Sequence, residues 1–171
     1  MRTDLYLAMG LQACFFSPEG TFYLGEDRSK KLLSDILSFL NGKSTVMLTT
    51  SIHRPDDGFY GSEPTSCIVG SRDVVMMPEV PGRYKLRAVC ERPNLLHNQQ
   101  VKNLLSSIDI ATVHIVGAET HSCVLFTAAA MRDANHRVIV HPGLLASRDS
   151  YLHDSALTIM SSTLGVEIAD E

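Results

Sequence analysis

The chain of 171 residues contains no tryptophan, no block of five or six basic residues, no long apolar run and no closely spaced cysteine pair. Because there is no basic block and the formal net charge is −4, the sequence predicts no nucleic-acid surface. Its apolar runs are far shorter than the roughly 18 residues that a membrane span needs. We therefore expect no partnership with nucleic acid or membrane.

The four cysteines (Cys14, Cys67, Cys90 and Cys123) are widely separated. This spacing does not match a zinc ribbon, and a chain of this size can bury a core without a disulfide framework. The apolar stretch near residue 5 is too short to resemble a signal peptide. We expect free thiols in a reducing, cytoplasmic environment.

Strands and helices are predicted to alternate along the chain. Strands are expected at 5–9, 45–50, 86–90, 112–116, 137–140 and 166–168, and helices at 27–40, 97–107, 120–134 and 150–163. The stretch 51–84 is rich in Pro, Gly, Asp and Ser and is predicted to be a long, functional loop. The alternation predicts one domain over 1–171, with three α/β/α layers around a mostly parallel six-stranded sheet.

Ligands of such sheets bind beyond the carboxyl ends of the strands, and a cysteine lies there. A β-branched run from Val113 ends at Gly117, and Thr120 begins a predicted helix with Cys123 in its first turn. First-turn N–H groups lack intrahelical partners and the helix dipole is positive there, so a thiolate is expected to be stabilised. Cys123 is therefore either a nucleophile or a small buried core thiol.

Three motifs resemble those of the isochorismatase-like superfamily of cysteine hydrolases, which includes nicotinamidases. Gly117-Ala-Glu-Thr-His-Ser-Cys-Val124, followed by Thr127-Ala-Ala, resembles its G-x-x-T-x-x-C-V…T-A-x-x-A signature. The segment 12–20 is similar to the family's D-x-Q-x-x-F-x-x-P-x-G loop, and 70–80 is similar to its G-T-x-G…P-E-L loop. The resemblance covers most of the chain and implies a Rossmann-like fold and a homo-oligomer of two or more copies.

The resemblance also implies roles for individual residues. Cys123 would be the nucleophile, and the backbone N–H groups of Cys123 and Glu119 would hold the oxyanion, next to a cis peptide bond. Residues after Val140 and the 51–84 loop are expected to line the mouth of the site. The side chains expected to contact substrate are Gln12, Phe16, His53, Thr120 and His121.

Two of the family's three catalytic groups are not matched. Gly10 stands where the family has its aspartate and cannot accept a proton. The family's lysine falls within 89–92, where Glu91 is the best alignment and Arg92 the next. Lys85 lies about 20 Å from Glu91 along the strand, which is too far to substitute. A carboxylate at Glu91 would raise the thiol pKa.

The histidines of the sequence do not indicate a metal site or a catalytic partner for Cys123. His53 matches a metal-binding histidine of nicotinamidase-like members, but Ser51 replaces the aspartate ligand, and Asp56 and Asp57 are read as turn residues. We therefore expect no metal and no cofactor. His121 is two residues from Cys123, and helix positions that close do not face each other, so no direct pair is expected. His97, His141 and His153 are read as solvated or capping residues.

Two functions stay open. The first is hydrolysis of a small amide, vinyl-ether or ester-like molecule by Cys123 with altered partners. The second is a pseudoenzyme that kept the fold for ligand binding or assembly, since the acid and the lysine are missing.

Overall fold

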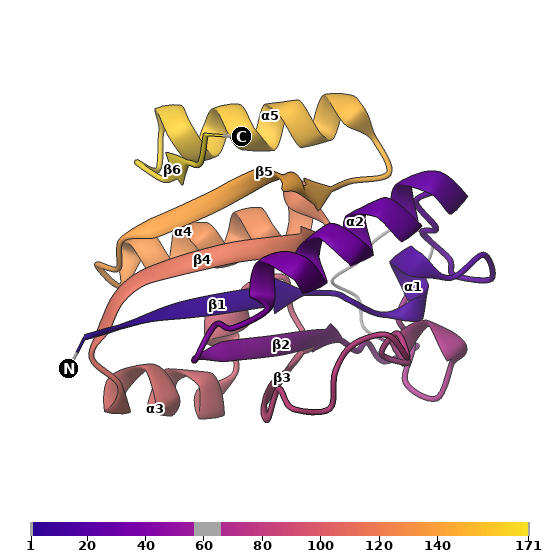
Figure 1. Ribbon diagram of the computed structural model, residues 1–171, viewed down its shortest axis with the longest axis horizontal. Coiled ribbons are helices and arrows are strands. Elements are labelled where there is room, and N and C mark those ends of the chain that lie inside the picture. Colours follow the sequence, from indigo (N-terminus) through magenta and orange to yellow (C-terminus); the bar gives the residue numbers. More distant parts are fainter. Residues whose placement is uncertain (1, 57–65, 171) are drawn as a thin grey trace.

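The computed structural model describes residues 2–56 and 66–170. They contain one six-stranded sheet in the spatial order β3-β2-β1-β4-β5-β6, and every strand pair is parallel (Figure 1). The strands are β1 (Thr3–Met9), β2 (Val46–Ser51), β3 (Leu86–Cys90), β4 (Ile110–Ala118), β5 (Val138–Ala146) and β6 (Glu167–Ile168). The predicted six-stranded parallel sheet is confirmed.

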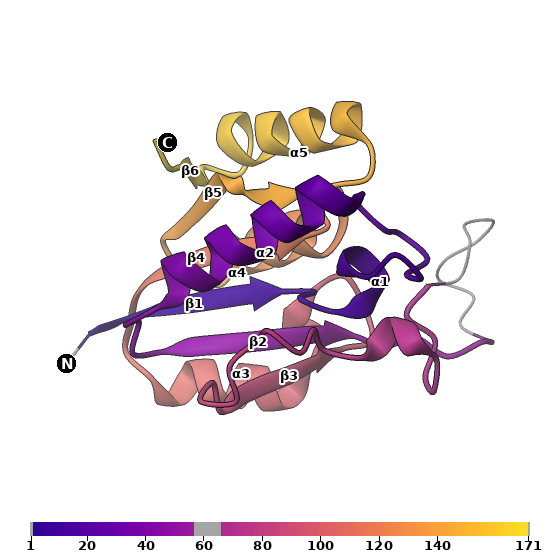
Figure 2. The same ribbon diagram turned by 45° about the vertical axis from the view of Figure 1, so that its right-hand side comes forward.

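The order of the strands reverses between β1 and β4. From β1 the chain proceeds outward to β2 and β3, then crosses back to β4 on the other side of β1 and continues to β5 and β6. Open parallel sheets bind ligands at this switch point, beyond the carboxyl ends of the strands. In Figure 2 the arrows of β1 and β2 point toward the short helix α1 (Ala13–Phe16), which marks that end of the sheet.

Helices cover both faces of the sheet. Figure 1 shows α2 (Glu26–Leu40) on the near face, with α3 (Gln99–Ser107) and α4 (Leu125–Asp133) on the far face. The helix α5 (Ser150–Ser162) packs beside α4. The predicted three-layer α/β/α arrangement is confirmed. None of the described helices combines the length and the apolar character that a bilayer span requires.

The sheet separates the hydrophobic core into two clusters, and the side chains of β1 point alternately into one and the other. Leu5, Leu7 and Met9 contact the α3–α4–α5 side, whereas Ala8 faces α2. All four side chains are fully buried. Because a parallel strand covered on both faces is apolar on both, β1 appears in the sequence as a continuous hydrophobic run.

The structure changes the boundaries of two predicted elements. The predicted helix 120–134 is broken, since a π-helical turn over Thr120–Val124 precedes α4. β5 extends to Ala146, because its pairing with β4 shifts register between Val140 and Leu145 and then resumes. Part of the predicted long loop, 57–65, including Asp57, lies outside the described residues.

A buried carboxylate holds the described part of the long loop against the segment after β1. Asp73 is 7% exposed and accepts hydrogen bonds from the Thr21 N–H (3.1 Å), the Thr21 hydroxyl (2.6 Å) and the Cys67 N–H (3.1 Å). Burial alone would raise the pKa of Asp73, but these hydrogen bonds outweigh burial and hold the pKa below its ordinary value.

We therefore predict that Asp73→Asn lowers the free energy of unfolding by about 1–3 kcal/mol at pH 7, because the amide cannot accept from all three donors. Because the pKa of Asp73 is lower in the folded than in the unfolded chain, its carboxylate stabilises the fold at pH values above the unfolded-state pKa. This stabilisation is lost as the pH falls through the folded-state pKa. The gap between wild type and variant, measured by urea unfolding, should therefore close below about pH 4. Asp35→Asn is the control, since its exposed pair with Lys31 should contribute at most about 0.5 kcal/mol. A gap that persists at low pH would contradict the prediction.

Candidate functional site

The backbones of β1 and β4 come into close contact where the strands end. Gly117 has φ +114°, and a Cβ there would lie 2.0 Å from the Met9 carbonyl oxygen. Gly10 has φ +64°, and a Cβ there would lie 2.6 Å from the Ala118 carbonyl oxygen. Only glycine fits both positions without a shift of the backbone. The chain therefore has no room for an acidic side chain at residue 10.

The turn after β4 is built around an irregular backbone. The Ala118–Glu119 peptide bond is cis, which confirms the implied cis bond next to Glu119. Ser122 has φ −118° and ψ −105°, outside the helical region, and the Val124 N–H donates to the Glu119 carbonyl oxygen at 3.3 Å. The N–H of Glu119 has no hydrogen-bond acceptor among the described residues. That N–H is therefore available as a donor for an oxyanion.

Three consecutive residues of this turn are bonded to the segment that follows β5. The bonds join the Arg148 N–H to Glu119 Oε1 (3.3 Å), Thr120 Oγ1 to His153 Nδ1 (2.8 Å) and His121 Nδ1 to Ser147 Oγ (2.9 Å). The position of the turn therefore depends on a segment about 30 residues later in the chain. No sequence motif indicated these pairs.

A cavity of about 290 Å³ lies against this turn. Its wall includes Cys123, two aromatic rings (Phe15 and Phe22) and two histidines (His53 and His121). A larger cavity of about 710 Å³ runs along α2 and does not include Cys123. We assign the site to the smaller cavity, because it contains the nucleophile candidate and several other reactive side chains.

The resting state of Cys123 differs from the expectation of a stabilised thiolate. Burial raises the pKa of this thiol, and the charge of Glu119 raises it further, against weaker opposing hydrogen bonds from Ser51 and Ser122. Its Sγ lies 3.6 Å from the Ser51 hydroxyl, and no described carboxylate or amine is hydrogen-bonded to it. The expectation was wrong because burial outweighs the N-terminal position of the turn. The thiol is protonated at neutral pH.

The charged groups of the cavity form a pair. Glu119, 5% exposed, lies with Oε1 3.8 Å from Nε of Arg148, and the Arg148 guanidinium stacks 3.8 Å from the centre of the Phe22 ring. Arg148 follows β5, where residues were expected to line the mouth of the site. Sequence reasoning did not identify Phe22, because it lies in a loop without a motif.

The residues aligned with the family's lysine do not reach Cys123. Glu91 is exposed and lines a separate cavity with Asn94, and Arg92 donates to the Glu91 carbonyl oxygen at 2.8 Å. The last residue of β3, Cys90, is the one coupled electrostatically to Cys123, and burial raises its pKa to about 12. Alternation along the strand places Cys90 and Glu91 on opposite sides. Glu91 therefore does not take the place of the family's lysine beside Cys123.

Three of the five predicted substrate contacts also need correction. Gln12 is fully buried, and its amide bonds the Ser51 N–H and carbonyl oxygen, so it joins β1 to β2 rather than lining the cavity. Phe16 lines the larger cavity instead. Its neighbour Phe15 is the phenylalanine that lines the site cavity. Thr120 is fully buried and faces away toward α5. Of the five, His53 and His121 line the cavity.

The described residues do not fit the metal site that nicotinamidase-like members would imply. Ser51 offers a hydroxyl, which lies against Cys123, and His53 donates from Nδ1 to the Ser66 carbonyl oxygen at 2.9 Å. Within 2–56 and 66–170, no group of three His, Cys, Asp or Glu side chains is placed to hold an ion.

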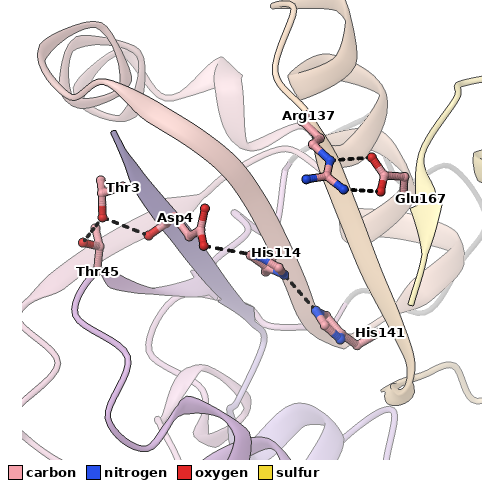
Figure 3. Close-up of polar contacts among 7 residues, drawn as sticks. All are labelled: Thr3, Asp4, Thr45, His114, Arg137, His141 and Glu167. Atoms are coloured by element: carbon pink, nitrogen blue, oxygen red, sulfur yellow. Dashed lines mark hydrogen bonds and ion pairs between the residues drawn. The ribbon is translucent and has the colours of Figure 1, made fainter. Parts of the chain in front are cut away.

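Two histidines read as solvated or capping are in fact half-buried and bonded to side chains. His153 bonds Thr120, as described above. His141 Nε2 lies 3.0 Å from His114 Nδ1, and Asp4 lies 4.0 Å from the other ring nitrogen of His114 (Figure 3). Burial lowers the pKa of both rings, that of His141 to about 4, so both are neutral at pH 7. This chain of side chains lies on the sheet and does not line the site cavity.

Comparisons with known proteins agree with this architecture. The model of the isochorismatase domain matches residues 41–170. Nicotinamidase PncA from Bacillus subtilis is 18% identical, with a TM-score of 0.83 and coverage of 98% of this chain and 99% of that one. The pyrazinamidase of Pyrococcus horikoshii, solved with zinc, is 16% identical, with a TM-score of 0.84 and 99% coverage of each chain. An isochorismatase-like hydrolase from Alkaliphilus metalliredigens is 17% identical, with a TM-score of 0.80 and coverage of 97% and 93%. No curated protein sequence matches the chain.

The contact between β1 and β4 predicts that a side chain at residue 10 is not tolerated. Gly10→Ala should lower the free energy of unfolding by at least about 2 kcal/mol, since an unfavourable φ and overpacking against Ala118 add. Gly42→Ala is the control, because Gly42 has φ +79° but nothing within 4 Å of its Cβ position. It should cost only about 1–2 kcal/mol. Equal losses for the two variants in urea unfolding would show that the contact is unimportant.

The protonated state of Cys123 predicts its alkylation behaviour. At pH 7 iodoacetamide should modify Cys123 more slowly than it modifies glutathione, and the rate should increase steadily with pH, because only the thiolate reacts. Peptide mass spectrometry resolves Cys123 from the buried Cys14, Cys67 and Cys90. Labelling at pH 6 that is faster than that of glutathione would mean that the turn stabilises a thiolate after all.

Proposed function

The chain belongs to the isochorismatase family, and from this we propose that it is a hydrolase of small molecules that uses Cys123 as its nucleophile. The observation that carries the proposal is that Cys123 and Glu119 line the same cavity, and that the Glu119 N–H has no acceptor among the described residues. A nucleophile next to a free backbone donor is the minimum arrangement for acyl transfer.

The size of the cavity and its aromatic walls favour a small, compact substrate. A volume of about 290 Å³ suits a small compact group, and the Phe15 and Phe22 rings offer apolar contact to a flat group. Amides, esters and vinyl ethers of this size are the proposed substrate class. The structures similar to this chain include nicotinamidases, whose names indicate an amide substrate.

The catalytic partners of Cys123 are proposed to differ from those of the family pattern. Gly10 stands at the position of the acid, and the residue at the end of β3 whose pKa Cys123 influences is Cys90 rather than a lysine. Proton transfer must therefore come from other cavity residues. The ionisable side chains that line the cavity with the two thiols Cys67 and Cys123 are His53, Glu119, His121 and Arg148.

A pseudoenzyme is the second candidate, and two observations favour it. The backbone contact at Gly10 leaves no room for the acid, and the thiol of Cys123 is protonated at rest. A chain that had lost catalysis but kept the cavity for ligand binding would show both features.

Turnover distinguishes these candidates. We expect the wild-type protein to hydrolyse at least one member of a panel of small amides, aryl esters and vinyl ethers. Cys123→Ala should lower kcat/KM at least about 10³-fold. During turnover, intact-protein mass spectrometry should show an acyl adduct on the wild type that Cys123→Ala lacks, with equal melting temperatures as the folding control. Ligand binding to both proteins without turnover by either would instead support the pseudoenzyme.

A further inference from the structure

The irregular turn brings His121 and Cys123 to the same cavity. Two residues apart on a regular α-helix, their side chains would point about 200° apart and only one would face the site. The non-helical backbone of Ser122 breaks this periodicity. Both side chains, each half-buried, line the cavity wall. No hydrogen bond joins His121 to Cys123 among the described residues, as expected, but the premise of a regular helix was wrong, and the two side chains share one cavity.

The ring of His121 is oriented by a buried hydroxyl. Its Nδ1 lies 2.9 Å from Oγ of Ser147, which is fully buried. The carbonyl oxygen of Ser147 accepts from Arg28 Nη1 at 2.8 Å, so the position of Ser147 is itself held from α2. In the tautomer that donates Nδ1–H to this hydroxyl, Nε2 keeps its lone pair. A ring held in this way can take up and return a proton at Nε2 while its other bond stays intact.

We propose that His121 is the acid–base residue of this site, in place of the missing acid at Gly10, with Ser147 as its positioning residue. The inference rests on the proposed hydrolase function. Glu119 is the less suitable base, since its carboxylate is bonded to Arg148 and a negative charge there opposes an oxyanion at the neighbouring N–H. His121 can be neutral before proton transfer and positive after it, which favours the oxyanion.

The proton path balances over one catalytic cycle. The path is written for an amide or ester substrate. His121 is not hydrogen-bonded to the sulfur in the described structure, so the Sγ proton passes to Nε2 through one water as Sγ bonds the acyl carbon. The imidazolium then protonates the leaving nitrogen or oxygen as its bond to carbon breaks, which leaves a thioester. Water attacks the thioester and gives its proton to Nε2. The C–S bond breaks, and the sulfur regains that proton.

Several ionisable groups surround His121 and shape its pH response. Arg28 approaches from α2 through Ser147, and α5 contributes His153, whose pKa is lowered by burial, with Arg28 and His121 as further causes. The cavity wall contributes the remaining five groups, which are His53, Cys67, Glu119, Cys123 and Arg148. Glu119 and Arg148 are of opposite charge and adjacent.

His121→Asn tests the catalytic role. The asparagine amide can keep the bond to Ser147, but it cannot take up a proton. On the substrate identified above, kcat should fall about 10²–10⁴-fold with KM changed less than threefold. The profile of kcat against pH should also lose the limb between about pH 5 and 8 that a histidine base produces. His97→Asn, on an exposed histidine that does not line the site cavity, should match the wild type.

The possible outcomes separate the assignment of His121 as acid–base residue from the hydrolase proposal itself. If Cys123→Ala abolishes turnover while His121→Asn stays within threefold of wild type, the assignment of His121 is wrong and the hydrolase proposal stands. The same holds if His53→Asn removes the pH limb and His121→Asn does not. If the wild type has no turnover, the hydrolase proposal fails and the assignment fails with it.

Ser147 is tested by its conservative variant. Ser147→Ala should lower kcat about tenfold and shift the pH limb, because the ring loses its orienting partner. Ser147→Thr keeps a hydroxyl and should recover both the rate and the pH limb. A purely structural role would lower the melting temperature of Ser147→Ala without moving the pH limb, and that result would overturn the positioning role.

Discussion

The contact between the β1 and β4 backbones at the switch point of the sheet is the constraint on which the site depends. Gly117 lies against the Met9 carbonyl and Gly10 against the Ala118 carbonyl, with no space for a Cβ at either residue. This contact brings the turn that contains Cys123 directly to the end of β1. It also removes the position from which the family's acid would act. One packing requirement therefore both forms the site and limits its chemistry.

The state of Cys123 shows which of two opposing effects is larger. A helix N-terminus stabilises a nearby charge by about 0.3–1 kcal/mol at an exposed site. Burial can shift the pKa of an ionisable group by several units in favour of its neutral form. In this turn the effect of burial is the larger one and raises the pKa of Cys123, and the negative charge of Glu119 raises that pKa further. A thiol that is protonated at rest requires a base, which gives the other ionisable groups of the cavity their importance.

Much of the architecture could be predicted from the sequence, because it depends on local patterns. The alternating strands and helices follow from periodicity and from glycine and threonine signals that act over a few residues, whereas the irregular backbone of the turn at Cys123 was not predicted. Predictions failed where side chains meet across the fold. Gln12 bonds β2 instead of substrate, and His141 bonds His114. Neither partner is near in sequence, so no local pattern indicated either contact.

The sequence by itself determined the layered fold, the family and the cysteine that we propose as nucleophile, since each is encoded in short stretches of chain. The tertiary structure alone decided what surrounds Cys123. It brought Arg148 and Ser147 to the turn from beyond β5, and it placed Glu91 in a different cavity. The physical reason is that proton transfer depends on distances between segments remote in sequence, and only packing of the whole sheet sets those distances.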